Sequence, residues 1–134
     1  ISKELVFVYD NKQTLTLNSA NILIPKIENY PIKTILALFN SSLYQLLYQK
    51  KFGSIKILRG DIEQLPLPII NNIKHKEIER FVNKLLNNNE PTERRKKIYT
   101  ELDDYIMNLF NLDKKEKDYI KKSIKVSDKL LNNI

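Results

Sequence analysis

The sequence predicts an α+β fold: a small mixed sheet with two helices, followed by a helical C-terminal part of about three helices. Two patterns lead to this prediction. Alternating β-branched, aromatic and leucine residues in the first quarter are typical of strands, whereas apolar residues after Asn72 recur with helical spacing. A rigid Pro-Leu-Pro segment at 66–68 separates the two patterns, so we expect two parts, 1–70 and 71–134.

The first part contains candidate strands and two candidate helices. Strands are expected where apolar side chains alternate, at 5–9, 15–17, 21–24 and 54–57. Pro31 opens a helix at a position where its missing N–H costs nothing. Ser42 and Gln45 form a capping-box pattern that starts a second helix, which ends near Gly53. Asp61 is expected to cap a turn before the Pro-Leu-Pro segment.

The second part is helical in pattern and amphipathic. Its three helices carry apolar stripes within 78–86, 98–110 and 119–131. Asn111 is the expected C-cap of the middle helix, and Asp113 with Glu116 forms an N-terminal capping box for the last one. Because these helices are not apolar all round, their stripes must pack on one another, on the first part, or on a missing part of a longer protein.

The composition excludes several kinds of site. The chain has no cysteine, a single histidine, His75, and two glycines, Gly53 and Gly60. Disulfides, thiolate zinc sites and cysteine nucleophiles are therefore excluded, and a glycine-rich phosphate loop needs more glycines than these. A histidine metal site or a Ser-His-Asp triad could be built only around His75, which we interpret as a solvated residue at the start of a helix.

The densest group of acidic residues does not form a catalytic pair. Asp103 and Asp104 follow Glu101, and neighbours on a helix point about 100° apart, so these carboxylates do not converge on one site. We interpret them as a solvated helix face paired with the basic run 94–97. The sequence therefore predicts no catalytic residue and no metal ligand, and we expect this chain to be non-catalytic.

The positive charge is concentrated in the first part. Residues 1–60 hold eight Lys or Arg against three acids, and no acid lies between Glu28 and Asp61. Such a one-sign stretch attracts polyanions, of which nucleic acid is the commonest. The alternative is a solvated surface whose lysines reflect codon bias. The sequence contains no signal peptide and no unbroken apolar stretch of about 18 residues, so we expect a cytoplasmic protein without membrane contact.

The candidate binding residues lie in this basic part. Lysine offers a point charge to phosphates, and arginine and amide side chains offer hydrogen-bonding forks. The predicted DNA-binding residues are Lys12, Asn18, Asn21, Lys50, Lys51, Lys56 and Arg59. The last four would hold phosphates, and the first three would contact bases or backbone. Tyr44 and Tyr48 lie nearby in sequence, but we expect both tyrosines in the core.

Four segments of the first part occur in an order that resembles a known family. They are Ile35–Leu43, Lys50–Phe52, Ile55–Leu58 and Leu65–Pro68. In this order they resemble the TaqI-like C-terminal specificity domain of N6-adenine DNA methyltransferases and type IIG restriction-modification enzymes. They are also similar to the specificity subunits of type I systems. The opening looks like the middle of such a domain, so its beginning would be missing here.

A second segment, at 102–116, resembles the helical tail that ends many such enzymes. Phe110 stands where that tail usually has tyrosine, Asn111 where it has glycine, and Asp113 where it has threonine. Each difference keeps the physical role of its position, as an apolar anchor, a helix C-cap and a helix N-cap respectively.

The resemblance implies a function. In this family the domain reads the DNA target sequence, while an upstream methyltransferase domain binds S-adenosylmethionine and flips the target adenine out of the stack. We therefore expect a DNA sequence-recognition (specificity) module of a bacterial restriction-modification DNA methyltransferase or endonuclease. Its partners would be double-stranded DNA and the upstream methyltransferase domain. The resemblance implies no cofactor in this chain and assigns S-adenosylmethionine, and Mg where the parent needs it, to the parent; this chain has no counterpart of the Asn-Pro-Pro-Tyr-type motif or of a cofactor glycine loop.

Two other functions remain open from the residues alone. The helices after residue 70 could form a protein-interaction or docking module without DNA contact, which predicts an oligomer that is lost when Leu102 or Ile106 becomes polar. A nuclease or transferase with a cryptic site would bind a metal or a cofactor, which the scarcity of His, Cys and Gly disfavours. Salt-sensitive binding to DNA separates the recognition module from the docking module.

Overall fold

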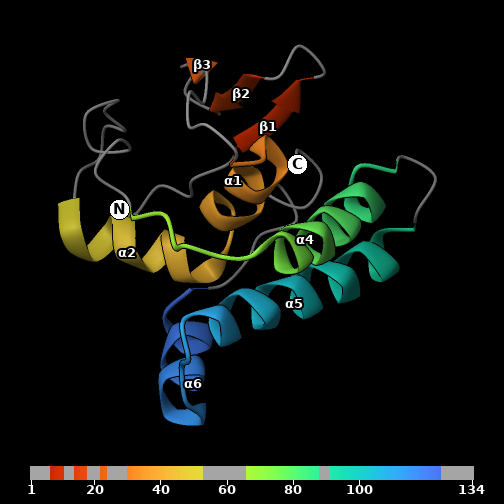
Figure 1. The fold of residues 1–134 in the computed structure, drawn as a ribbon. Helices are drawn as coiled ribbons and strands as arrows, with labels where there is room; N and C mark the ends of the chain where they lie inside the picture. The colour runs from red at the N-terminus through yellow and green to blue at the C-terminus, as the bar shows by residue number, and fades with distance from the viewer. Residues whose placement is uncertain are drawn as a thin grey trace.

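The computed structural model describes residues 7–10, 14–17, 22–23, 30–52, 66–87 and 91–124. Three strands are followed by five helices within these residues (Figure 1). The elements are β1 (Phe7–Asp10), β2 (Thr14–Leu17), β3 (Ile22–Leu23), α1 (Ile32–Phe39), α2 (Ser42–Phe52), α4 (Asn72–Leu85), α5 (Thr92–Leu109) and α6 (Lys114–Ser123).

The helices pack around α1 and along one antiparallel pair. Figure 1 shows α4 between α1 and α5, with α4 and α5 running in opposite directions. Helix α2 leaves the end of α1 and contacts both α5 and α6. The small sheet lies against α1 through β1 and β2, on the side away from α6. Helix α1 is therefore covered from several sides.

The predicted fold class, an α+β fold around a small mixed sheet, is wrong. Among the residues whose side chains the structure describes, the buried members of the hydrophobic core all come from helices. The strands contain four, four and two residues, and they pair only antiparallel in the order β1-β2-β3. Strands this short do not enclose a core by themselves. The alternating runs at the start of the sequence form short strands, and the described core is helical.

The centre of the core is α1. Its residues from Thr34 to Phe39 are all buried, as expected for a helix that other elements cover on most sides. The other buried side chains of this core cluster are Leu43, Tyr44, Tyr48, Ile78, Val82, Leu85, Ile98, Tyr99, Leu102, Ile106, Met107 and Ile120. These residues come from both sides of residue 70, so the two expected parts share one core. The domain boundary itself stays a prediction, and the candidate strand at 54–57 and the expected cap Asp61 lie outside the described residues.

The start of α6 confirms the predicted capping box. The Asp113 carboxylate accepts a hydrogen bond from the backbone N–H of Glu116 at 2.8 Å, and the Glu116 carboxylate accepts one from the N–H of Asp113 at 3.0 Å. Two backbone donors that no helical carbonyl can reach are thereby satisfied. Helix α4 begins in a similar way, because the Asn71 side chain accepts from the N–H of Lys74 at 2.9 Å.

The end of α5 differs from the prediction by one residue. Phe110 is the C-cap, and Asn111 is the next residue, with a φ of 56°. The N–H of Leu112 donates to the carbonyl of Met107, and the N–H of Asn111 donates to that of Asn108. These two bonds form a Schellman motif, in which the residue after the cap takes the left-handed conformation. Asparagine tolerates this conformation better than most residues, which explains its presence where glycine is usual.

Candidate nucleic-acid interface

Two of the seven predicted DNA-binding residues lie in the described part of the chain. Lys50 and Lys51 are exposed and occupy the last turn of α2. The other five predicted contacts, Lys12, Asn18, Asn21, Lys56 and Arg59, lie outside the described residues. Lysines in a last helical turn also interact favourably with the carbonyl end of the helix dipole. The position of Lys50 and Lys51 is therefore compatible with both phosphate binding and helix stabilisation.

The direction of α2 is set at its junction with α1. Asn40 and Ser41 connect the two helices and are 2% and 1% exposed. The Ser41 hydroxyl donates to the carbonyl of Leu38 at 2.6 Å and accepts from the N–H of Tyr44 at 3.2 Å. Ser41 thus caps α2, one residue before the predicted Ser42. A buried junction requires a partner for each polar group, because water does not reach it.

Helix α5 supplies further partners for this junction. The Tyr99 hydroxyl donates to the carbonyl of Asn40, and the Asp103 carboxylate accepts from the backbone N–H of Ser42 at 2.8 Å. Burial raises the pKa of Asp103, while its hydrogen bonds with Ser42 and the nearby Lys121 act in the opposite direction. Asp103 is 8% exposed, so our interpretation of it as part of a solvated face is wrong. Only the tertiary structure brings this carboxylate to the start of α2.

Two tyrosine hydroxyls hold the Pro-Leu-Pro segment against the helices. The Tyr44 hydroxyl donates to the carbonyl of Pro66, and the Tyr30 hydroxyl donates to that of Pro68 at 2.9 Å. Burial raises the pKa of Tyr30 to about 12, which keeps its hydroxyl protonated as a donor at neutral pH. Burial also raises the pKa of Tyr44. The chain therefore leaves α2 at Phe52 and is bound to α2 again at Pro66.

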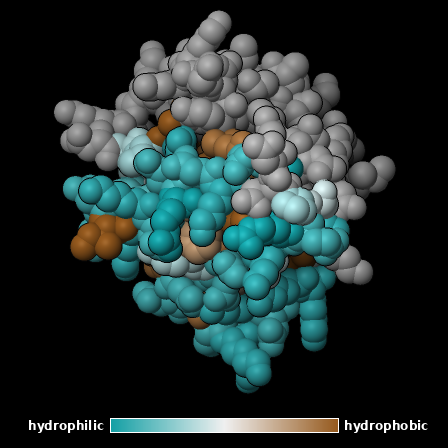
Figure 2. All heavy atoms as spheres, turned by 90° about the vertical axis from the view of Figure 1, so that its right-hand side faces the viewer, coloured by the Kyte–Doolittle hydropathy of each residue, from teal (hydrophilic) through white to brown (hydrophobic). Residues whose placement is uncertain are grey.

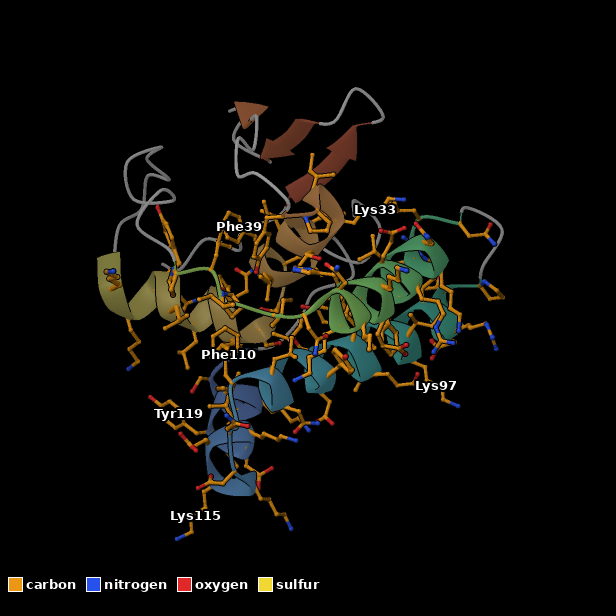
Figure 3. The ribbon with its side chains drawn as sticks, viewed as in Figure 1. Lys33, Phe39, Lys97, Phe110, Lys115 and Tyr119 are labelled. Atoms are coloured by element: carbon orange, nitrogen blue, oxygen red, sulfur yellow. The ribbon has the colours of Figure 1, made fainter. Side chains whose placement is uncertain are left out.

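The two candidate tyrosines of α2 are confirmed as core residues. Tyr44 is 0% exposed and Tyr48 is 3% exposed, so neither ring is available for stacking on a base. The ring of Tyr44 lies 5.6 Å from that of Phe39 and 6.1 Å from that of Phe110, between centroids. Phe110 is thus an apolar anchor, the role expected at its position in the tail. Figure 3 shows Phe110 between α2 and α6.

His75 is buried, which corrects the interpretation of a solvated residue at a helix start. It is 6% exposed, and its Nδ1 lies 2.9 Å from the hydroxyl oxygen of Thr34. The ring of Tyr30 meets the His75 ring edge-on, with 4.9 Å between centroids. Burial lowers the pKa of His75, which favours the neutral imidazole. These contacts give His75 a structural role between α1 and α4.

The helices after residue 70 carry both signs of charge. Arg80 pairs with Glu77 at 2.6 Å, Lys117 with Asp104 at 3.1 Å, and Lys96 with Glu93 at 3.9 Å. Figure 2 shows a mostly hydrophilic face over the coloured part of the molecule, and Figure 3 shows Lys97 and Lys115 extending away from the ribbon. The excess of positive over negative charge in residues 1–60 is larger than that in this helical part.

Within the described part of the chain, no three His, Cys, Asp or Glu side chains are grouped so that they could hold a metal ion. The same residues include no helix that is long and apolar enough to cross a membrane. The tightly placed titratable groups, Asp103 and His75, each have a hydrogen-bond partner inside the fold. Both side chains therefore contribute to the packing of helices.

A comparison with protein-family models identifies the family of this chain. The TaqI-like C-terminal specificity domain matches residues 1–67, which is half of the chain. The chain belongs to this family. The match contains β1–β3, α1, α2 and the first two residues of the Pro-Leu-Pro segment, including Pro66, whose carbonyl accepts from Tyr44. This TaqI-like domain is a specificity module of restriction-modification enzymes, a kind of domain that is typically non-catalytic.

Comparison with curated proteins and with solved structures found no match. The family match confirms the resemblance of the first part, whereas α4, α5 and α6 lie beyond it. The resemblance of the 102–116 segment to a family tail therefore stays a prediction.

Sequence reasoning missed three side chains that hydrogen-bond to distant backbone groups: Tyr30, Tyr99 and Asp103. One signal could have revealed the last two. Tyr99 and Asp103 are four residues apart and lie beside the apolar stripe of Leu102 and Ile106, so they flank the buried face of α5. Their partners, Asn40 and Ser42, are about 60 residues away in sequence, and no local pattern connects them.

Proposed function

We propose that this TaqI-like domain is the DNA sequence-recognition module of a bacterial restriction-modification protein. It binds duplex DNA and positions an upstream methyltransferase domain of the same polypeptide. The observation that carries the proposal is the coincidence of two features. The family match ends at residue 67, and the basic stretch without any acid, 29–60, lies inside it.

Phosphate binding is assigned to the end of α2 and the residues that follow. Lys50 and Lys51 are exposed there, and Lys56 and Arg59 follow within nine residues of Lys50. Each lysine or arginine that neutralises a phosphate releases counterions, which makes binding weaken as salt rises. Lys12, Asn18 and Asn21 belong to the connections that follow β1 and β2 in sequence, and we assign base or backbone contacts to them.

The parent is proposed to be a DNA adenine-N6 methyltransferase, with or without endonuclease activity, as in the type IIG systems. S-adenosylmethionine, and Mg where DNA is cleaved, would bind to that parent. In this arrangement α4, α5 and α6 act as a spacer or docking surface against the methyltransferase domain. The shared core supports such an arrangement, because a rigid connection transmits the position of the recognition domain to the catalytic one.

A salt titration with a charge-matched control tests DNA binding. Binding of the chain to a pool of duplex oligonucleotides is measured between about 50 mM and about 200 mM salt. The slope is that of the logarithm of the DNA association constant against the logarithm of the salt concentration. We expect it to fall by about 3.6 in magnitude, about 0.9 for each phosphate contact, when four residues are changed together to alanine: Lys50, Lys51, Lys56 and Arg59. Sequencing of the bound pool then reports whether bases are read.

The control removes four positive charges from the helices after residue 70. Lys97, Lys114, Lys115 and Lys122 are all exposed, and their change to alanine is expected to leave most of the slope intact. An equal loss of slope in both variants would mean that net charge alone attracts the DNA. Absence of salt-sensitive binding by the unchanged chain would contradict the proposal.

A docking module without DNA contact is the second candidate function, and one feature favours it. A hollow of about 360 Å³ lies between α2 and α6, and its lining includes Leu46, Leu112 and Tyr119. Tyr119 is 53% exposed. Leu102 and Ile106 are in the core, so making them polar would unfold the chain and cannot test docking. Tyr119→Lys tests docking instead. If the chain is a docking module, sedimentation should show an oligomer of the unchanged chain that the Tyr119→Lys variant does not form. The unchanged chain should then also show no salt-sensitive binding to DNA.

A further inference from the structure

We propose that Tyr99 and Asp103 of α5 are positioning residues that fix the direction of α2 and thereby place Lys50 and Lys51 against DNA phosphates. This inference rests on the proposed function, because it concerns the same DNA-binding residues. It adds a contribution from a helix that lies outside the family match. The helical part then shapes the recognition surface directly, in addition to any role as a spacer.

The first step of the argument is the shortness of the junction. Helix α1 ends at Phe39 and α2 begins at Ser42, so two residues determine the angle between them. Both connecting residues are buried, and their backbone groups need partners inside the protein. A change in this angle would leave these backbone groups without hydrogen-bond partners. The side chains that bind them therefore also fix the angle between α1 and α2.

The second step is that α5 binds both sides of this junction. The Tyr99 hydroxyl donates to the carbonyl of Asn40, which follows α1, and the Asp103 carboxylate accepts from the N–H of Ser42, which opens α2. Tyr99 and Asp103 are four residues apart, about 6 Å along one face of a helix. Their spacing on α5 therefore sets the relative position of the two ends that they hold.

The third step is the cost of burying Asp103. A carboxylate in a core loses its hydration, and well-packed apolar residues often replace buried charged groups without loss of stability. The groups near the Asp103 carboxylate are Ser42, Lys121 and Asp104, and the direct hydrogen bond goes to Ser42. A negative charge at this point also complements the positive end of the α2 dipole. We assign the carboxylate to orientation of α2, a role that an apolar residue could not fill.

The fourth step is that a small tilt of α2 at its start displaces its far end, where Lys50 lies. Lys50 lies eight residues beyond Ser42, which corresponds to about 12 Å along the helix axis. A tilt of α2 by about 15° would move the base of the Lys50 side chain by about 3 Å. A charge-assisted hydrogen bond to phosphate is about 2.8 Å long, so after such a tilt the lysine stem keeps the contact only by leaving its preferred rotamer, which weakens binding. Small changes at the junction are therefore amplified at the DNA-facing end.

The test measures the salt slope of DNA binding on fully folded protein. Three variants of the whole chain are compared: Asp103→Ala, Asp103→Asn and Asp104→Asn. Circular dichroism establishes a temperature at which each variant is folded, so that lost stability does not enter the result. Asp103→Ala removes the acceptor and is expected to lower the slope by about 1.8, the contribution of two phosphates. Asp103→Asn keeps an oxygen acceptor for Ser42 and is expected to retain the slope.

Asp104→Asn is the matched control, because it removes the same charge from the neighbouring position, where the partner is Lys117. Its slope is expected to equal that of the unchanged chain. If Asp103→Ala does not fold, Tyr99→Phe removes a single hydroxyl from the same junction, and a loss of slope of the same sign is expected. A folded Asp103→Ala, or failing that a folded Tyr99→Phe, that keeps the full slope would overturn the inference.

A further variant separates this inference from the proposed function. Lys50→Ala with Lys51→Ala should lower the slope by about 1.8, and adding Asp103→Ala should cause no further loss, because the same two phosphates are involved. If the lysine pair has no effect, α2 does not contact DNA and the positioning role fails, whereas the proposed function fails only if the unchanged chain shows no salt-sensitive binding. If the lysine pair lowers the slope and Asp103→Ala does not, only the positioning role fails.

Discussion

His75 and Asp103 are ionisable side chains that the fold buries, and each is tied to a partner more than 40 residues away. No neighbouring residue in the sequence indicates the burial of His75, whereas Asp103 lies beside the apolar stripe of Leu102 and Ile106. Both were interpreted as solvated, because a lone histidine between lysines and an acidic pair on a helix are usually on the surface. At the scale of residues, whether an ionisable side chain is buried depends on the hydrogen-bond partner available to it. Packing between distant segments determines that partner.

The buried histidine leads to a pH-dependent stability. Burial lowers the pKa of His75 in the folded state below the 6.5 of the free side chain. The unfolded chain therefore binds the proton more readily, and the free energy of unfolding should fall as pH drops through 6.5, by at most about 1.4 kcal/mol per pH unit. His75→Gln, which cannot titrate, should show a smaller fall between about pH 7.5 and about pH 5.5 in urea titrations. Parallel pH profiles of the two proteins would refute this role for His75.

The elements of the chain follow local rules more closely than the fold does. The capping box of α6 and the helix after Pro31 lie where the sequence predicts them, since cap residues act on backbone groups within the same turn. The end of α5 and the start of α2 each differ from prediction by one residue. At the start of α2 the neighbouring Asn40, Ser41 and Ser42 can all serve as the cap, and Ser41 is the one that accepts from the N–H of Tyr44.

The left-handed residue after α5 can be tested directly. Asn111 has a φ of 56°, a conformation that costs a residue with an ordinary Cβ about 1 to 2 kcal/mol. Asn111→Ala should therefore lower the free energy of unfolding by about 1 kcal/mol, and Asn111→Gly should raise it slightly. Asn108→Ala, on the exposed face of α5, serves as the control and should be nearly neutral. Equal effects of alanine at both positions in urea titrations would count against the Schellman motif.

The described residues are organised around one helical core, whose members come from both sides of residue 70. We therefore expect a single cooperative unfolding transition. Leu102→Ala, at a site 3% exposed, should destabilise the chain by about 2 to 5 kcal/mol. Helix content by circular dichroism and tyrosine fluorescence should shift together, because tyrosines of α2 and α5 belong to the same core. Two separate transitions would favour the domain boundary expected near 70.

The sequence by itself determined the family, the helix starts set by local caps, the basic character of residues 1–60, and the absence of cysteine chemistry. These properties depend on composition or on residues within one helical turn. The tertiary structure alone decided that the core is helical, that α5 binds the α1–α2 junction, and that His75 and Asp103 are buried. Those outcomes depend on contacts between residues far apart in the chain, where the partner of a buried polar group is chosen by packing and not by its neighbours in sequence.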